Sequence, residues 1–206
     1  MIDLYFWTTD NGYKARLMLE ETGLEYRLKP VALPKRQQFS PEFLKINPGH
    51  KIPAIVDHNG PGGTELRLFE SGAILKYLGE KSGNGLYPSD PARRVKVDQW
   101  LFHASSTFTP IAQQLSLFLY RFGEDLPPAK KHYADRYGDL LAILDRHLAD
   151  HRYLADDYSA ADVATYPDVD QHERLGFSLD SHPNLKRWHD AIASRPAVGR
   201  AWTPIE

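Results

Sequence analysis

The 206-residue sequence contains no cysteine. This absence excludes structural disulfides, thiolate metal sites, a cysteine nucleophile and a Cys-x-x-Cys redox pair. Any thiol chemistry that this protein carries out must therefore use a thiol that the ligand brings.

Long apolar runs are also absent. No stretch approaches the roughly 18 consecutive apolar residues of a membrane-spanning helix. The N-terminus begins with the strand-like MIDLYFW rather than with a basic and then apolar signal. We therefore expect a cytoplasmic protein that has no membrane partner.

The sequence has no excess of charge of either sign. It holds 25 Lys and Arg residues against 27 Asp and Glu residues, which gives a formal net charge of −2. This balance argues against general nucleic-acid binding and against attraction to anionic membranes. The hydrophobic content of 42% is that of an ordinary globular protein, and the length suffices for one large domain or two small ones.

The N-terminal part of the chain predicts a mixed α/β module. Residues 2–7 are typical of a buried strand, residues 8–12 of a polar turn into a helix that Gly23 ends, and residues 26–31 of a second strand. Such a βαβ unit is a right-handed parallel crossover. The pattern then predicts a short helix at 41–46, a strand at 51–56, a hairpin-type loop at 59–63, a strand ending at Phe69 and a helix over 73–78.

The junction after Phe69 carries a chemical signal. Glu70 and Ser71 lie between a strand and the N-terminus of a helix, where unpaired N–H groups and a partial positive charge can hold a carboxylate. Glu70 can hold an ammonium group, so the pair suits the zwitterionic head of an amino acid. The alternative is that Ser71 only caps the helix, as serine commonly does.

The remainder of the chain is helical in its apolar periodicity. Residues 82–88 are typical of a linker, so we predict two domains, residues 1–82 and an all-helical domain of residues 88–206. A capping box, in which Ser159 and Asp162 bond each other's backbone, predicts one helix start. The other predicted helices cover 92–122 with a bend near Pro110, 129–148, and 184–194, which Arg195-Pro196 ends.

In this order and spacing, three motifs make the chain resemble the cytosolic glutathione transferases over essentially its full length. These motifs are Asn47-Pro48 through Ile52-Pro53, Phe69-Glu70-Ser71-Gly72-Ala73-Ile74, and Tyr158-Ser159-Ala160-Ala161-Asp162. The resemblance implies a thioredoxin-like α/β N-terminal domain, which binds glutathione, and an all-α C-terminal domain.

Further residues look like the bacterial Nu-class branch of that family, which is associated with glutathione-dependent disulfide reduction and with binding two glutathione molecules or their disulfide. They are Thr9, Asn11-Gly12, Gln38 and Asp135-Arg136-Tyr137. One residue departs from the branch, because Asp10 stands where proline is usual. Asp10 brings a carboxylate close to the expected sulfur, and we expect it to point to solvent.

The resemblance also implies roles for individual residues. Ile52 would pair its backbone with the cysteinyl backbone of glutathione, next to a cis peptide bond at Pro53. Glu70 and Ser71 would hold the γ-glutamyl ammonium and carboxylate groups, and Gln38 would bond toward the glycyl end.

Two further roles concern the sulfur and the second glutathione. Thr9 and Asn11 would stabilise the thiolate near a helix N-terminus, and Arg136 would pair with a carboxylate of the second glutathione. Each has a structural alternative: Thr9 and Asn11 are ordinary helix caps, Gln38 is a common solvated loop amide, and a helical arginine is usually exposed.

Other candidates are weaker. Tyr5 alternates as a strand residue and Tyr13 lies inside a helix, so we expect structural roles for both. His147 and His151 share a helix face and could form a metal pair, but no third ligand stands in a matching context. We therefore expect a solvated face there and no metal.

The resemblance implies a homodimeric enzyme that uses glutathione as cosubstrate to reduce disulfides, with transferase or peroxidase side activity. Its partners would be glutathione or glutathione disulfide and a small disulfide or electrophile. Two alternatives stay open: a classical conjugating transferase, and a non-catalytic glutathione-transferase-like binding module, because fold does not fix function.

Overall fold

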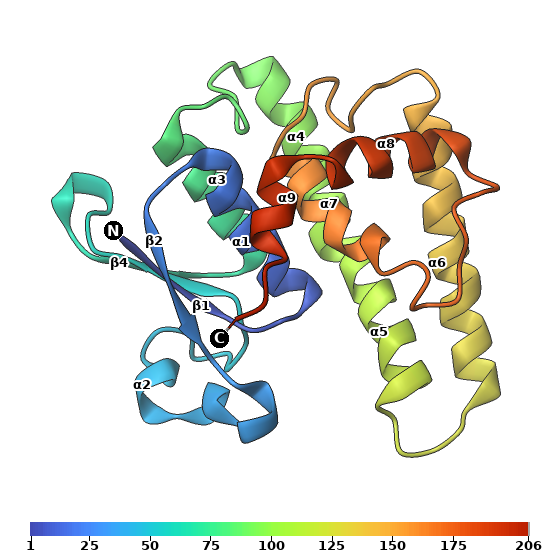
Figure 1. Cartoon of the computed structure of the whole chain (residues 1–206), viewed down its shortest axis with the longest axis horizontal. Coiled ribbons are helices and arrows are strands. Elements are labelled where there is room, and N and C mark those ends of the chain that lie inside the picture. Colours follow the sequence, from blue (N-terminus) through green and yellow to red (C-terminus); the bar gives the residue numbers. More distant parts are fainter. Residues whose placement is uncertain (206) are drawn as a thin grey trace. The chain divides into compact units, whose positions relative to one another are not determined.

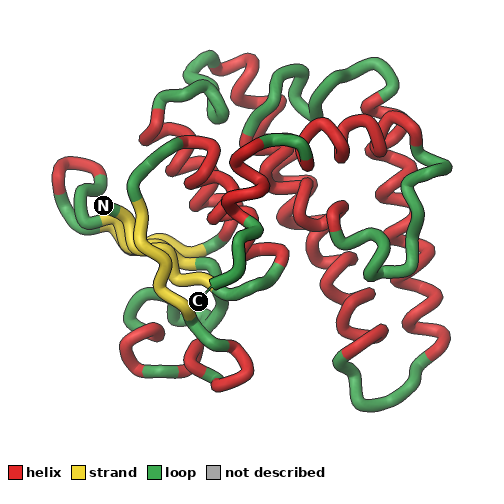
Figure 2. Tube along the Cα trace, in the orientation of Figure 1, coloured by secondary structure: helices red, strands yellow, loops and turns green. Residues whose placement is uncertain are grey.

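The computed structural model describes residues 1–205. Within this range the chain forms two compact units, residues 1–89 together with 195–205, and residues 90–194. The predicted domains of 1–82 and 88–206 stay a prediction, and the C-terminal segment is where the observed division differs from them. Strands occur in the first unit, and the second unit is built of helices (Figure 2).

The first unit is built on a four-stranded mixed sheet in the order β2-β1-β3-β4. The strands are β1 (Ile2–Phe6), β2 (Tyr26–Pro30), β3 (Ala54–Asp57) and β4 (Leu66–Phe69). The predicted parallel pairing of the first two strands is confirmed, with Ile2 opposite Tyr26. The β1–β3 and β3–β4 pairs are antiparallel.

Alternating side chains of β1 supply the two sides of this sheet. Ile2, Leu4 and Phe6 are buried, and the helices α1 (Asp10–Thr22) and α3 (Ser71–Ser82) pack together beside the sheet (Figure 1). Gly23 ends α1 with a positive φ of 69°, as predicted.

A small second core lies at the opposite side of β1, where Tyr5 points. Tyr5 packs there with Val31, Ala54 and Phe43, and Phe43 belongs to the short helix α2 (Pro41–Leu44). Ser40 caps α2 by accepting a hydrogen bond from the Phe43 N–H at 3.2 Å. Two 3₁₀ turns, Leu33–Lys35 and Gln37–Phe39, connect β2 to this helix.

A buried carboxylate ties α3 to the sheet. Asp57 accepts a hydrogen bond from the Tyr77 hydroxyl at 2.5 Å and forms an ion pair with Lys81 at 2.9 Å. Burial opposes ionisation of Asp57, but the Tyr77 and Lys81 donors and the Asn59 N–H hold its pKa below the usual value. Asp57 therefore contributes stability above its unfolded pKa that is lost as the pH falls.

The predicted linker after α3 packs against the first unit. Leu86 and Tyr87 are buried, and a Cβ at Gly79 of α3 would lie 2.6 Å from the Tyr87 Cβ. Glycine at position 79 is therefore what allows this segment to approach α3.

The C-terminal end corrects the sequence-based reading. Arg195-Pro196 ends the preceding helix as predicted, but Pro196 then begins another helix, α9 (Pro196–Ala201). Proline is accepted at a first helical position because the N–H that it lacks would have no partner there. Helix α9 packs against α1 (Figure 1).

The second unit contains five α-helices among residues 90–194: α4 (Pro91–His103), α5 (Thr109–Tyr120), α6 (Pro127–Leu148), α7 (Ala160–Asp170) and α8 (Pro183–Ala193). A π-helical turn over Ala104–Phe108 separates α4 from α5, so the predicted helix over 92–122 is interrupted just before Pro110. Proline cannot donate to a carbonyl of the preceding turn, and a π turn is one way to accommodate this.

The predicted capping box at the start of α7 is present. Asp162 is fully buried and accepts hydrogen bonds from the N–H groups of Ser159 at 2.9 Å and Leu154 at 3.0 Å, and from the Trp188 indole at 2.8 Å. Burial raises the pKa of Asp162 to about 6, against the effect of these donors.

None of the helices within residues 1–205 is long and apolar enough to span a bilayer.

Candidate active site

The strand register brings most of the predicted site residues to one edge of the sheet. Tyr5 near the end of β1 lies opposite Ala54 at the start of β3, and Ala54 lies opposite Phe69 at the end of β4. The segments 7–11, 52–53 and 70–71 directly adjoin these positions. They therefore meet at the same sheet edge, although they are far apart in the sequence.

Helix α1 begins at this edge. Thr9 is its N-cap residue, and the Thr9 Oγ1 accepts a hydrogen bond from the Gly12 N–H at 3.1 Å. The hydroxyl proton is not used by this bond, so Thr9 can cap the helix and still donate to a ligand. The predicted alternative, a cap, and the predicted ligand contact are therefore compatible at this residue.

Asn11 lies in the first turn of α1 and is half-buried. Its Oδ1 is buried without a hydrogen-bond partner among the described residues. A buried polar atom that the protein leaves unsatisfied is uncommon and marks a place where a ligand can supply the partner. The backbone N–H groups of this first turn point in the same direction as the positive end of the helix dipole.

Asp10 is the first residue of α1 and is half-buried. A carboxylate in the first turn of a helix interacts favourably with the dipole. The position is also one where proline is accepted, which agrees with the residue usual in the branch that the sequence resembles.

Glu70 and Ser71 form the start of α3 at the same edge. Glu70 is the N-cap residue, but its side chain makes no capping hydrogen bond, and Ser71 is the first helical residue. The alternative reading, in which Ser71 is the cap, is therefore wrong. Since no residue of the described chain bonds the Ser71 hydroxyl, this group is available to a ligand together with the first N–H groups of α3.

The backbone of Glu70 is unusual. Its φ of 72° and ψ of 115° are rare for a residue with a Cβ, and such conformations cost of order 1–3 kcal/mol. Strained residues of this kind cluster at ligand-binding sites. The exposed Glu70 carboxylate is left to face outward beside the N-terminus of α3.

Ile52 and Pro53 adjoin the start of β3. The peptide bond between them is cis, as the resemblance implies. Pro53 is buried, and the Ile52 side chain packs on the small core of Val31, Phe43 and Ala54. This packing directs the side chain inward and leaves the Ile52 backbone at the sheet edge.

Gln38 lies in the 3₁₀ turn Gln37–Phe39, which follows β2. Its Oε1 is buried and bonds none of the described residues, whereas the neighbouring Gln37 Oε1 accepts from the Ala32 N–H at 2.8 Å. The two adjacent glutamines thus differ, since Gln37 fastens the turn and Gln38 has hydrogen-bonding capacity left.

The two tyrosines near α1 have structural environments. Tyr5 contacts Phe43 with a ring separation of 5.8 Å, and burial raises its pKa. Tyr13 stacks on Trp202 at 4.5 Å with an interplanar angle of 12° and meets Phe6 edge-on. Trp202 had no role in the sequence-based reading, because no local pattern connects it with α1.

Arg136 lies on α6, in the second unit, and is exposed. His147 lies on the same helix, but His151 follows the helix end at Leu148, so the predicted shared helix face is wrong. The two rings nevertheless stack at 4.3 Å. His147 Nε2 lies 2.9 Å from the Leu154 carbonyl oxygen, and His151 Nδ1 lies 2.9 Å from the Asp156 carboxylate. Within residues 1–205 no group of three or more His, Cys, Asp or Glu side chains is placed to hold a metal ion.

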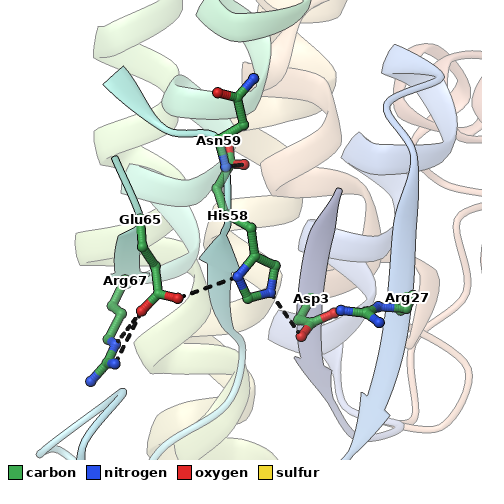
Figure 3. Close-up of polar contacts among 7 residues, drawn as sticks. Asp3, Arg27, His58, Asn59, Glu65 and Arg67 are labelled. Carbon is green, nitrogen blue, oxygen red and sulfur yellow. Dashed lines mark hydrogen bonds and ion pairs between the residues drawn. The ribbon is translucent and has the colours of Figure 1, made fainter. Parts of the chain in front are cut away.

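A polar network crosses the strands away from the site edge (Figure 3). Arg27 pairs with Asp3 at 2.8 Å, His58 lies between Asp3 and Glu65 at 3.2 and 3.3 Å, and Glu65 pairs with Arg67 at 3.0 Å. Burial opposes ionisation of Asp3, but His58 and Arg27 hold its pKa below the usual value. Because these charges satisfy one another, we assign this network to the cohesion of the sheet.

Comparison with known proteins shows which family the chain is similar to. Residues 2–80 match the family model described as glutathione S-transferase, N-terminal domain, and residues 108–196 match that of the C-terminal domain. Disulfide-bond oxidoreductase YfcG of Escherichia coli is 45% identical over 204 residues, which are 98% of this chain and 94% of that protein.

Solved structures of glutathione transferases are also similar to this chain. A glutathione transferase from Burkholderia graminis, with two glutathione molecules per subunit, has a TM-score of 0.90 at 38% identity and covers 97% of this chain and 86% of its own. One from Pseudomonas putida, with one glutathione disulfide per subunit, has a TM-score of 0.92 at 38% identity and covers 99% and 92%.

Proposed function

Because the chain belongs to the glutathione S-transferase family, we propose that it is a glutathione-dependent enzyme that reduces small disulfides. Glutathione occupies the sheet edge at which α1 and α3 begin. The observation that carries the proposal is the register of the sheet, which gathers the Thr9–Asn11, Ile52–Pro53 and Glu70–Ser71 segments there.

Each part of glutathione finds a complementary group at this edge. The cysteinyl backbone of the ligand pairs with the Ile52 backbone, as an added strand would. Ser71 and the N-terminus of α3 hold the γ-glutamyl carboxylate, and Glu70 holds the ammonium group. Gln38 bonds toward the glycyl end.

The chemistry uses only ligand thiols, because the chain has no cysteine. A glutathione thiolate attacks one sulfur of the substrate disulfide, forms a mixed disulfide and releases one substrate thiolate. A second glutathione thiolate attacks the glutathionyl sulfur, forms glutathione disulfide and releases the other substrate thiolate. The two protons lost by glutathione end on the two thiols released.

Thr9 and Asn11 stabilise the thiolate rather than remove its proton. A hydroxyl and an amide N–H are hydrogen-bond donors and are too weak as bases to accept a proton near pH 7. The N-terminus of α1 adds a partial positive charge. The site therefore lowers the pKa of the thiol and leaves the proton to solvent.

The second glutathione and the assembly belong to the same proposal. Arg136 suits a carboxylate of the second glutathione, because a guanidinium can bind it through two parallel hydrogen bonds. A homodimer is supported by Val95 and Phe102 of α4, which are 66% and 62% exposed and seven residues apart on one helix face. A cytoplasmic location supplies reduced glutathione.

Turnover of two substrate classes tests this function. We expect purified protein with glutathione to reduce a small mixed disulfide faster than it conjugates a chloronitroaromatic compound. The reverse preference would favour the classical transferase, and a hydroperoxide measures the side activity. Glutathione binding without turnover of any of these substrates would favour the binding module. The Ser71→Ala variant is the control, because turnover at the proposed site should fall in it while any reaction outside this site should not.

A further inference from the structure

The C-terminal segment, residues 195–205, is fastened along helix α1. Arg195 forms a bidentate pair with Glu21 at 2.6 and 2.8 Å, and Arg200 pairs with Glu20 at 2.6 Å. These contacts lie at the C-terminal half of α1, and they join residues 174 and 180 positions apart.

Beyond Arg200 the segment reaches earlier turns of α1. The Arg16 guanidinium donates to the Thr203 carbonyl oxygen at 2.7 Å. Trp202 stacks on Tyr13 with ring centroids 4.5 Å apart. The segment therefore runs from the end of α1 back toward its beginning (Figure 1). Thr9 is the N-cap residue at that beginning.

The Tyr13 contact is one helical turn from the proposed thiolate site. The Tyr13 N–H donates to the Thr9 carbonyl oxygen at 2.9 Å, and the Gly12 N–H donates to the Thr9 Oγ1 at 3.1 Å. The first bond holds the Thr9 backbone to this turn, and the second orients the Thr9 hydroxyl. A first helical turn has few internal hydrogen bonds and opens more readily than a helix interior, so its position depends on what holds it from outside.

We propose that Trp202 is a positioning residue for the proposed reaction. By stacking on Tyr13, the indole keeps the first turn of α1 in its helical conformation. It thereby holds the Thr9 hydroxyl and the Asn11 amide toward the glutathione sulfur. The charged pairs at Glu20 and Glu21 attach the C-terminal segment, and Trp202 is the part that acts on the site end. This inference rests on the proposed function for its catalytic consequence, but the positioning itself does not.

Hydrogen exchange of the ligand-free full-length protein tests the positioning. In Trp202→Ala we expect the Gly12 and Tyr13 amides to exchange about 2- to 10-fold faster, the range that the loss of an aromatic pair allows. Trp202→Phe restores a flat ring and should restore slow exchange. Arg200→Ala, two residues before Trp202, should leave the exchange of these two amides unchanged, because Arg200 contacts the C-terminal half of α1.

Two results would overturn the positioning role. One is wild-type exchange of Gly12 and Tyr13 in Trp202→Ala, and the other is equal acceleration in Arg200→Ala. Trp202→Leu, which keeps apolar volume without a stacking face, serves if the alanine variant unfolds, and thermal unfolding of each variant shows that the fold is intact.

The catalytic consequence is measured separately. In Trp202→Ala we expect a higher pKa for bound glutathione, read from thiolate absorbance, and a lower kcat with little change in KM, and Trp202→Phe should recover both. Faster exchange with an unchanged thiol pKa and kcat would overturn the link to catalysis and keep the structural brace. Absence of glutathione binding in the wild-type protein would defeat the proposed function and leave the exchange result standing.

Discussion

At the scale of single residues, the site contains hydrogen-bonding groups, both donors and acceptors, that the fold leaves unused. The Ser71 hydroxyl bonds none of the described residues, and the Asn11 Oδ1 and Gln38 Oε1 are buried without partners among residues 1–205. A folded protein rarely leaves such groups unsatisfied. Their presence in the first turns of α1 and α3 and in the 3₁₀ turn Gln37–Phe39 is what the proposed ligand explains.

Ser71→Ala should weaken glutathione binding by roughly 1.5 to 3 kcal/mol, the contribution of a hydrogen bond to a charged group. Calorimetric titration of both proteins measures the change. The fold should be intact, because Ser71 is not the cap of α3. Ser194→Ala, an exposed serine at the end of α8, is the matched control, and equal affinity of Ser71→Ala and wild type would remove Ser71 from the site.

Thr9→Ala and Asn11→Ala should each raise the apparent pKa of bound glutathione, because each removes a group that favours the thiolate. Ultraviolet absorbance of the thiolate against pH measures it. Thr9→Ser keeps the hydroxyl and should keep the wild-type pKa, which separates the ligand contact from the loss of a methyl group. Asp10→Pro should change the pKa little, since proline fits the first helical position.

The expectation for Thr9 and Asn11 has a clear point of failure. If both alanine variants retain the wild-type pKa and rate, the group that activates the thiol lies elsewhere. If the pKa of the bound glutathione thiol falls strongly in Asp10→Pro, the Asp10 carboxylate faces the sulfur in the wild type and raises the thiol pKa.

At the scale of elements, helix termini and strand ends position the side chains of the proposed site. Helix α7 shows how much one terminus can matter outside the site, since Asp162 satisfies the Ser159 and Leu154 N–H groups and the Trp188 indole at once. Removing an acceptor in such a place leaves buried donors without partners, each at a cost of about 1–3 kcal/mol.

Asp162→Ala should therefore lower the free energy of unfolding by about 3 kcal/mol or more, whereas Ser159→Ala should cost about 1 kcal/mol, as a lost cap does. Urea unfolding at pH 7 measures both. A smaller effect for Asp162→Ala than for Ser159→Ala would mean that the carboxylate does not organise this region.

The same carboxyl group makes a pH-dependent contribution. Its folded pKa of about 6 lies above the ordinary value of 3.8, so its stabilisation is complete below pH 4 and is lost as the pH rises through about 6. The difference corresponds to about 3 kcal/mol. The stability of the wild type relative to Asp162→Asn should fall by that order between pH 4 and pH 7, and a rise would contradict the assigned direction.

At the scale of the whole molecule, two further proposals concern the number of ligands and of subunits. Arg136→Ala should reduce the stoichiometry of bound glutathione from two per subunit toward one while the first affinity is kept. Titration calorimetry with glutathione measures it. Arg146→Ala, another exposed arginine of α6, is the control, and retention of both ligands in Arg136→Ala would place the second site on other residues.

Val95→Glu should shift the proposed dimer toward monomer, because it places a charge on the exposed apolar face of α4. Sedimentation equilibrium of wild type and variant at equal concentration measures this. Glu80→Gln, an exposed substitution on α3, should leave the association unchanged. A wild-type monomer, or an undisturbed dimer of Val95→Glu, would refute this face as the interface.

The sequence by itself determined what acts within one turn or one strand. Cysteine content decided that the reactive thiol belongs to the ligand, and the capping box predicted where α7 begins. The order and spacing of short motifs determined the fold, because alternation, helical periodicity and caps are local properties of the chain.

Only the tertiary structure decided which distant groups meet. The register of β1, β3 and β4 joins Thr9, Ile52 and Glu70 at one edge, and local conformation made Glu70 rather than Ser71 the cap of α3. The stacking of Trp202 on Tyr13 depends on packing between segments at opposite ends of the sequence. Such contacts follow from the burial of complementary surfaces, a property that no single stretch of sequence carries.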